Sequence, residues 1–405
     1  MRLRTLLLAG AALAVGLGAG LAQAANYGPG VTDKEIKLGG IHPYSGPASA
    51  YGTIGKAVTA YFRMINEQGG INGRKINYVD LDDGYSPPKT VEQARKLVEQ
   101  EQVLAIFNSL GTPTNTAIHK YMNAKKVPQI FVATGASKWG HPEKYPWTMG
   151  WQPTYPGESA NYAAYLGKNK PDAKVAILYQ NDDYGKDYLD GFIDALGDKA
   201  KKMVVAKVPY EVTDPTVDPQ IIELKNSGAD TFFNITTPKF AAQAIRKAYD
   251  SGWKPLHFLN SVSSSVGSVL KPAGLDKSTG LITAYYLKDP TDPQWAKDAD
   301  FKAWSQWMDK YYPDGDKSNA FNVYGYSVAA TMAVVLKNAG DNLTRENLMK
   351  TAANLKDVKI PMVLPGITVN TSAKDFYPLE CEQLSKFDGH KWVLFGDIIC
   401  PKKMM

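Results

Sequence analysis

Two short segments rich in glycine and hydroxyl side chains are the strongest candidates for chemistry in this chain of 405 residues. They comprise Ser109, Leu110, Gly111 and Thr112 in the first segment and Thr134, Gly135, Ala136 and Ser137 in the second. Each segment follows an apolar run and precedes a helical pattern, so free backbone N–H groups and hydroxyls gather at a helix start. Such a group suits a small anion such as a carboxylate. Plain helix capping is the alternative, because Ser and Thr are preferred caps.

No arrangement typical of catalysis competes with this prediction. The chain has no GxSxG elbow, no Walker loop and no mid-chain cysteine that could act as a nucleophile. Asp82-Asp83 and Asp182-Asp183 are paired carboxylates that could serve acid–base chemistry. Each pair follows a predicted strand and precedes a turn containing glycine, so solvated helix entry is the simpler interpretation.

Cysteine and histidine usage predicts one disulfide and no metal site. The only two cysteines are Cys381 and Cys400. In an oxidising compartment such a pair predicts a disulfide, which would close a loop of about 20 residues and stabilise the fold by about 3 kcal/mol. Two free thiols are the alternative. The five histidines are scattered without ligand spacing, so we predict neither a metal nor another cofactor.

The N-terminus has the pattern of an export signal. Arg2 and Arg4 precede an almost wholly apolar or glycine stretch from Thr5 to Leu21, and Ala22-Gln23-Ala24 is a small-x-small cleavage site. We therefore predict a signal peptide over residues 1–24, cleaved near Ala24, and export across the inner membrane into the periplasm. A membrane span is the alternative interpretation of this stretch. No second apolar run is long enough to span a bilayer.

Short apolar runs alternate with helical patterns from Glu35 onward, which is typical of parallel α/β sheets. Strands are predicted over 36–41, 76–81, 103–107 and 128–133 in a first unit, and over 174–179, 230–235, 257–259 and 281–286 in a second. Helices are predicted over 50–68, 112–123, 185–196, 293–312 and 321–339, followed by a β-rich tail over 363–399. Two doubly wound units predict ligand binding beyond the carboxyl ends of the strands.

Length and charge narrow the function classes. A mature chain of about 380 residues exceeds what one core usually supports, which favours two lobes. The formal net charge is +6, but basic and acidic residues are interspersed without a long basic run. This distribution argues against nucleic-acid binding.

Four motifs resemble the type I periplasmic binding proteins, specifically the leucine/isoleucine/valine-binding family of receptors for ABC importers. They are IKLGGIHPYSGPASAYG from Ile36, EQGGINGRKINYVDLDDGYSP from Glu67, NDDYGKD from Asn181 and KFDGHKWVLFG from Lys386. The resemblance covers essentially the whole mature chain. It implies an α/β fold of two Rossmann-like lobes joined by three crossovers, which closes on a ligand about a hinge and is not an enzyme.

The resemblance also implies where the lobes and the ligand contacts lie. Crossovers near Trp151, Thr283 and Met362 would give a lobe one of residues 26–150 plus 285–361 and a lobe two of residues 151–284 plus 362–405. The implied ligand-binding positions are Tyr51, Ser109, Leu110, Gly111, Thr112, Thr134, Gly135, Ser137 and Phe321 in lobe one, and Tyr184, Thr237 and Val262 in lobe two.

One departure from the family pattern concerns the amino group of the ligand. Amino-acid binders place an acidic residue after the strand predicted at 257–259, where this chain has Ser261-Val262-Ser263, and a neighbouring Tyr falls on Thr237. A buried ammonium without a carboxylate partner is costly. We therefore expect an organic or aromatic acid, or another small polar molecule, rather than leucine. An alignment slip would instead let Asp182 or Asp183 supply the charge.

The function that this resemblance implies is binding without bond breakage. The protein would be a monomer that delivers a small carboxylate-bearing solute to an inner-membrane ABC permease. A sensor that presents the same fold to a membrane receptor is one alternative, and a secreted hydrolase that uses Asp82 or Asp182 is another.

Overall fold

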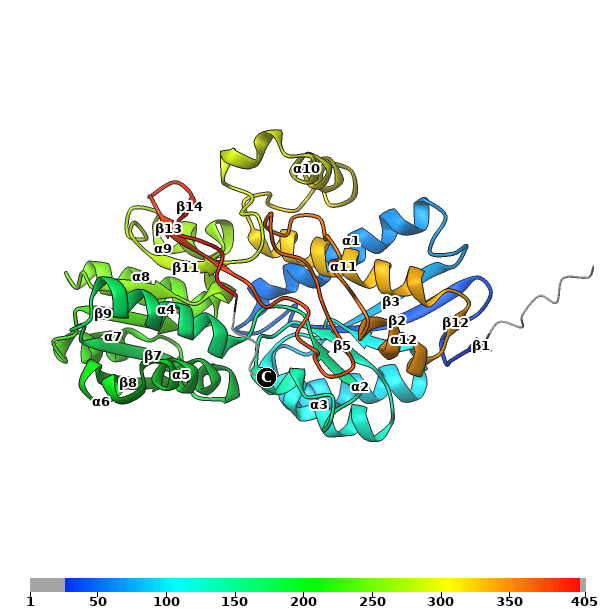
Figure 1. The fold of residues 1–405 in the computed structure, drawn as a ribbon, viewed down its shortest axis with the longest axis horizontal. Coiled ribbons are helices and arrows are strands. Elements are labelled where there is room, and N and C mark those ends of the chain that lie inside the picture. Colours follow the sequence, from blue (N-terminus) through cyan, green and yellow to red (C-terminus); the bar gives the residue numbers. More distant parts are fainter. Residues whose placement is uncertain (1–25, 401–405) are drawn as a thin grey trace, which may run out of the picture.

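Two α/β lobes lie side by side in the computed structural model, which describes residues 26–400 (Figure 1). One lobe is built on a five-stranded sheet and the other on a seven-stranded sheet. The signal peptide predicted over residues 1–24 lies outside the described residues. None of the helices within residues 26–400 combines the length and apolar character needed to cross a bilayer.

The five-stranded sheet is parallel throughout and has the order β3-β2-β4-β5-β6. Its strands are β2 (Glu35–His42), β3 (Lys75–Asp82), β4 (Ala105–Phe107), β5 (Gln129–Val132) and β6 (Thr148–Gly150). The connecting helices are α1 (Gly52–Glu67), α2 (Pro87–Arg95) and α3 (Thr112–Ala124). β4 and β5 are buried throughout, which explains their continuous apolar sequences.

The seven-stranded sheet repeats this winding and adds two antiparallel strands, in the order β14-β13-β11-β10-β9-β7-β8. Its strands are β7 (Val175–Gln180), β8 (Val204–Tyr210), β9 (Thr231–Ile235), β10 (Leu256–Leu259), β11 (Ile282–Tyr285), β13 (Gln383–Phe387) and β14 (Trp392–Leu394). The helices of this part are α4 (Tyr155–Asn169), α5 (Asp183–Leu196), α6 (Ala200–Met203), α7 (Asp218–Asn226), α8 (Pro238–Asp250) and α9 (Lys271–Ala273).

The chain passes between the two sheets three times, after β6, after β11 and before β13 (Figure 1). The second passage leads through α10 (Ala299–Tyr311) to α11 (Ala320–Ala339) and α12 (Arg345–Ala352), and a short strand β12 (Asn342–Leu343) pairs with β1 (Asn26–Tyr27). α11 packs closely on α1, because a Cβ at Gly325 would lie 2.6 Å from Cβ of Ala57. Two Rossmann-like lobes with three crossovers are thus confirmed.

The third passage enters the second lobe later along the chain than the crossover predicted near Met362. Thr371 donates from its hydroxyl to the carbonyl oxygen of Ala352 at 2.6 Å, and Tyr377 donates to the carbonyl oxygen of Ser137 at 2.7 Å. Residues 363–380 therefore run along the first lobe before the chain enters β13.

Several elements were missed by the sequence patterns, among them β6, β8, α4, α7 and α12. β8 alternates exposed and buried residues at a sheet edge and contains Lys207 and Pro209, which weaken its strand signal. The helix predicted over 293–312 is interrupted at Asp298, whose carboxylate accepts from the Phe301 N–H at 3.0 Å and so begins α10.

The predicted disulfide joins Cys381 to Cys400 and ties the tail to the third passage. Its loop spans a sequence separation of 19 residues. Replacing both cysteines by serine is expected to lower the free energy of unfolding by about 3 kcal/mol, because the unfolded chain regains loop entropy. Denaturant unfolding of the double variant measures this loss. An equal loss in a reduced sample of the unaltered chain is also expected, and unchanged stability in both samples would contradict the prediction.

Candidate functional site

The loops at the carboxyl ends of the two sheets face each other across a cavity. In each parallel array the strand order reverses between the first and third strands in sequence, β2 and β4 in one lobe and β7 and β9 in the other. Connections from such a point leave on opposite faces of the sheet and open a crevice. The crevices meet in a cavity with about 820 Å³ of atom-free space, its mouth included.

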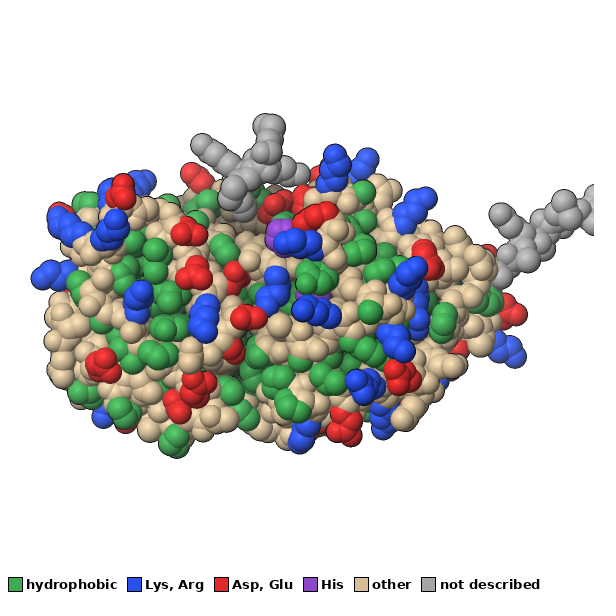
Figure 2. Space-filling model, turned by 90° about the horizontal axis from the view of Figure 1, so that it is seen from below, with side chains coloured by type: hydrophobic (Ala, Val, Ile, Leu, Met, Phe, Trp, Pro, Cys, Tyr) green, Lys and Arg blue, Asp and Glu red, His purple; other side chains and the backbone are tan. Residues whose placement is uncertain are grey.

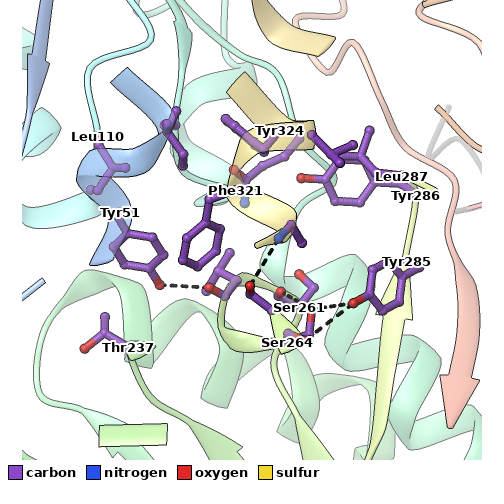
Figure 3. A pocket seen from close by; sticks show the side chains of 18 of the residues that line it. Tyr51, Leu110, Thr237, Ser261, Ser264, Tyr285, Tyr286, Leu287, Phe321 and Tyr324 are labelled. Carbon is purple, nitrogen blue, oxygen red and sulfur yellow. Dashed lines mark hydrogen bonds between the residues drawn. The ribbon is translucent and has the colours of Figure 1, made fainter. Parts of the chain in front are cut away.

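Eight aromatic side chains line the cavity, and five of them are labelled in Figure 3. They are Tyr51, Tyr85, Tyr155, Tyr184, Tyr285, Tyr286, Tyr324 and Phe321. Burial raises the pKa of each of these phenols above its usual value, so all of them stay neutral. The wall thus offers flat apolar surfaces that carry hydroxyl groups, a combination that suits aromatic or hydrophobic solutes with polar substituents.

The cavity contains no free charge of either sign among its described lining residues. Lys288 is the one charged residue that lines it, and its Nζ lies 2.6 Å from Asp298 Oδ1 and 3.1 Å from Asp300 Oδ2. The two carboxylates compensate the ammonium. No lining carboxylate is present to pair with an ammonium group on a ligand.

Eight of the twelve predicted ligand-binding residues line this cavity. They are Tyr51, Leu110, Gly111, Thr112, Tyr184, Thr237, Val262 and Phe321. Tyr51 and Phe321 lie side by side with ring centroids 5.0 Å apart (Figure 3). The Tyr51 hydroxyl donates to the carbonyl oxygen of Val262 at 3.0 Å and so joins the two lobes.

The other four predicted positions, Ser109, Thr134, Gly135 and Ser137, lie behind the lining, and their role in ligand contact stays a prediction. The Ser109 hydroxyl donates to Asn115 Oδ1 at 2.5 Å, inside the first turns of α3. Ser137 binds Asp187 of α5 through its hydroxyl at 2.7 Å and its N–H at 2.8 Å. Ser137 therefore makes a contact between the lobes.

The paired carboxylates occupy turns and caps rather than the cavity lining. Asp82 accepts from the N–H groups of Tyr44 and Gly84, at 2.8 and 2.9 Å. Asp182 begins α5 by accepting from the Tyr184 N–H at 2.9 Å, and Asp183 forms an ion pair with Lys138. Asp182 thus lies at a helix entry as expected, whereas Asp83 is fully buried and accepts from the Tyr85 N–H at 2.8 Å, so it is not solvated. Within residues 26–400 no cluster of three or more His, Cys, Asp or Glu side chains is arranged to hold a metal ion.

Ion pairs and hydrogen bonds hold the two lobes together around the cavity. Three contacts link the first lobe to the second. They are the ion pair of Lys138 with Asp183 and the hydrogen bonds of Ser137 with Asp187 and of Tyr51 with Val262. Figure 2 shows positive and negative side chains intermixed over one face of both lobes, without a large area of one sign.

Five cavity tyrosines were not predicted as ligand-binding residues from the sequence, namely Tyr85, Tyr155, Tyr285, Tyr286 and Tyr324. Among the aromatic side chains between residues 139 and 155, Trp139 and Trp151 pack in the interior. Trp151 is fully buried, and its Nε1 donates to the Thr331 hydroxyl at 3.0 Å. Tyr155 is the exception that reaches the cavity. The switch-point rule applied to the turn after β3 could have found Tyr85, which follows Asp82-Asp83.

A buried carboxylate supports one wall of the cavity from behind. Glu158 accepts from the N–H and the hydroxyl of Ser261 at 2.7 and 2.6 Å, and from the hydroxyls of Tyr162 and Tyr188 at 2.7 and 2.8 Å. Ser261 lines the cavity. Burial raises the pKa of Glu158, and the four hydrogen bonds act against that rise. Glu158 therefore fixes the position of Ser261.

A second buried carboxyl, Glu382, makes stability depend on pH. Burial and the neighbouring Glu158 raise the pKa of Glu382 well above its usual value of 4.5. A raised pKa in the folded state gives stability that is present below pH 4.5 and lost as pH rises toward the folded pKa. Glu382→Gln is therefore expected to leave stability unchanged near pH 4 and to increase it progressively at neutral and alkaline pH. Urea unfolding at several pH values measures this, and parallel pH profiles of both proteins would contradict it.

Comparison with known proteins places the chain in a family. A family model described as periplasmic binding protein matches residues 35–387. The Leu/Ile/Val-binding protein homolog 7 of Brucella abortus is 24% identical over 265 residues, covering 64% of this chain and 65% of that relative, so the match spans just under two thirds of the relative's length.

Solved structures share the fold. A branched chain amino acid ABC transporter protein from Thermus thermophilus with bound valine has a TM-score of 0.82 at 16% identity, covering 92% of this chain and 98% of that one. An ABC transporter solute-binding protein from R. palustris in complex with 4-hydroxybenzoate has a TM-score of 0.74 at 19% identity, covering 91% and 96%. Because the family model spans most of the sequence, this chain belongs to the periplasmic binding protein family.

Proposed function

We propose that this chain is the periplasmic solute-binding protein of an ABC importer and that its solute is a small organic or aromatic acid without an amino group. The observation that carries the proposal is the cavity, which joins the predicted anion-binding turn to walls of neutral phenols and has no free carboxylate in its lining. Binding and lobe closure are the whole activity, and the bound acid is released unchanged.

The carboxylate of the solute is assigned to the start of α3. Leu110, Gly111 and Thr112 line the cavity where this helix begins. The N–H groups of Leu110 and Gly111 donate to the carbonyl oxygens of Ile41 and Ala133, and Pro113 has no N–H. The Thr112 N–H is left to stabilise a negative charge together with the helix dipole. The ring or chain of the solute then lies between Tyr51 and Phe321 of one lobe and Tyr184 of the other.

The missing partner for an amino group separates this chain from amino-acid binders. An ammonium ion that enters the cavity loses its hydration and finds only neutral hydroxyls and the compensated Lys288. Such a transfer is unfavourable by several kcal/mol. Neither Asp182 nor Asp183 lines the cavity, because one caps α5 and the other pairs with Lys138. A solute that carries only a carboxylate avoids this cost.

The remaining parts of the proposal concern assembly and motion. The protein acts as a monomer, and the ligand-bound form docks to an inner-membrane permease. Within residues 26–400, lobe one comprises residues 26–150 and 285–361 and lobe two residues 151–284 and 381–400, while residues 362–380, which the sequence assigned to lobe two, move with lobe one because Tyr377 and Thr371 contact Ser137 and Ala352.

Isothermal titration calorimetry with defined solutes tests this proposal. The panel is benzoate, 4-hydroxybenzoate, phenylacetate, octanoate, leucine and valine. We expect one acid to bind with a stoichiometry of one, to be recovered unchanged, and to stabilise the fold by about 2.7 kcal/mol at 100 times its dissociation constant. Tight binding of leucine or valine without binding of any acid would refute the proposal, and chemical conversion of the bound acid would indicate an enzyme.

A further inference from the structure

Ser261 presents its hydroxyl oxygen, but not its hydroxyl hydrogen, to the cavity that it lines. The hydroxyl donates to Glu158 Oε2 at 2.6 Å, and the Ser261 N–H donates to Glu158 Oε1 at 2.7 Å. The same carboxylate accepts from the hydroxyls of Tyr162 and Tyr188, at 2.7 and 2.8 Å. All four groups have a hydrogen to give, and only an ionised carboxylate accepts from all of them at once. The hydrogen of the Ser261 hydroxyl is therefore held by Glu158, and its lone pairs are left for a ligand.

Two neighbouring hydroxyls are committed to the protein in the same way. The Tyr285 hydroxyl donates to Asp289 Oδ2 at 3.0 Å, and the Ser264 hydroxyl donates to the carbonyl oxygen of Ser261 at 2.8 Å. A second acceptor for Ser264 is the Tyr285 oxygen at 3.2 Å, so its hydrogen stays within the protein in either case. Ser261, Ser264 and Tyr285 thus form an acceptor side of the cavity. The buried Tyr184 hydroxyl, in contrast, has no partner within residues 26–400 and is free to donate.

The acceptor side selects a solute group that carries a hydrogen. An ammonium group has hydrogens, but it needs a carboxylate in contact to offset its lost hydration. Glu158 and Asp289 do not line the cavity, and both are already surrounded by donors, since Asp289 also accepts from the Thr291 N–H at 2.8 Å. A hydroxyl group is neutral and costs far less to bury once it is hydrogen-bonded. The acceptor side therefore suits a hydroxyl on the solute.

We propose that Ser261 is a specificity-determining contact that accepts a hydrogen bond from a hydroxyl of the solute, so that the solute is a hydroxy acid. Glu158 is the positioning residue, because it holds the Ser261 hydrogen away from the cavity. Figure 3 shows Ser261 and Leu110 on opposite sides of the Phe321 ring, so a carboxylate near Leu110 leaves the other end of the solute to reach Ser261. This inference rests on the proposed function, because it assumes an acid in the cavity.

Paired acids that differ only in the hydroxyl test this inference by calorimetry. The probes are the three hydroxybenzoate isomers, each with the matching fluorobenzoate, and 8-hydroxyoctanoate with octanoate. Fluorine is close to a hydroxyl in size but has no hydrogen to donate. We expect at least one hydroxy acid to bind about threefold to tenfold more tightly than its partner, which is the range of one net hydrogen bond.

Ser261→Ala removes the proposed acceptor and should abolish this preference. The affinity for the hydroxy acid is expected to fall to that of its partner, while the affinity for the partner stays nearly unchanged. A merely structural role of Ser261 would instead lower both affinities by the same factor.

Glu158→Gln tests the positioning role through the direction of one hydrogen bond. The amide oxygen must face the Ser261 N–H, so the amide nitrogen faces the Ser261 hydroxyl and donates to it. The hydroxyl hydrogen of Ser261 then turns toward the cavity. The preference for the hydroxy acid over its partner is expected to shrink or reverse. Ser261→Ala decides the matter alone if thermal melts show Glu158→Gln unfolded.

Ser159→Ala is the matched control. Ser159 is buried on α4 beside Glu158, its hydroxyl donates to the carbonyl oxygen of Tyr188 at 2.8 Å, and it does not line the cavity. This variant should keep the full preference. If the unaltered chain binds acids but prefers no hydroxy acid to its partner, or if Ser261→Ala keeps the preference, this inference alone is overturned. Absence of acid binding by the unaltered chain would overturn the proposed function and this inference with it.

Discussion

Glu158→Ala is expected to lower the free energy of unfolding by about 3–5 kcal/mol and to weaken solute binding. Glu158 is only 2% exposed and accepts four hydrogen bonds. Its removal leaves the hydroxyl of Tyr188 and the N–H of Ser261 without their acceptor in the protein interior, and each unsatisfied group costs about 1–3 kcal/mol. Because Ser261 lines the cavity, the loss reaches the binding site as well.

Denaturant unfolding with and without the bound acid measures both effects of Glu158→Ala. Glu92→Ala is the control, because Glu92 lies exposed on α2 and should change stability by less than about 0.5 kcal/mol. A variant at Glu158 that is as stable as the control would show that the carboxyl is not needed to satisfy its neighbours.

Gly111→Ala is expected to lower the affinity for the acid by at least about tenfold and stability by about 1–2 kcal/mol. Gly111 has a φ of 98°, in a region that side-chain-bearing residues rarely adopt. A Cβ there would lie 2.5 Å from Cε2 of Tyr85 and 2.7 Å from the Thr114 hydroxyl. Tyr85 lines the cavity, so moving its ring changes the space next to the start of α3.

Gly167→Ala is the matched control for Gly111→Ala. Gly167 lies within α4, and a Cβ there meets nothing within 4 Å. Alanine favours a helix over glycine by about 1 kcal/mol, so this variant should be slightly more stable and should bind the acid normally. If calorimetry gave the two variants equal affinities for the acid, position 111 would not require glycine for binding.

The sequence predicted the site best where a short motif follows a strand. Leu110, Gly111 and Thr112 come directly after β4, and Tyr184 and Thr237 lie at the starts of helices that follow β7 and β9. Strand order brings the turns of each lobe together, because the carboxyl ends of parallel strands share one edge of their sheet. The two sets of turns meet because the lobes face each other across the cavity. The two lobes were predictable for the same reason, since alternating apolar runs and helices specify parallel sheets.

The tyrosine wall was not predictable from such patterns. Tyr324 lies on α11, which is buried on nearly all sides and so gives no amphipathic periodicity to show which face meets the cavity. Tyr285 ends β11 and Tyr286 follows it, and both lie in an apolar run that is typical of core. Tyr155 begins α4, one of the helices that the sequence patterns missed, and Pro156 and Gly157 follow it. Only packing between lobes shows which of these rings reach the solute.

Small-angle X-ray scattering with and without the tightest-binding acid tests most directly whether two lobes close on one solute. The interlobe contacts Lys138–Asp183 and Ser137–Asp187 define a closed form, and the saturated protein should scatter as this form does. We expect a smaller radius of gyration at saturation than in the ligand-free protein. Superimposable curves at a concentration where calorimetry shows the site filled would contradict closure on the solute.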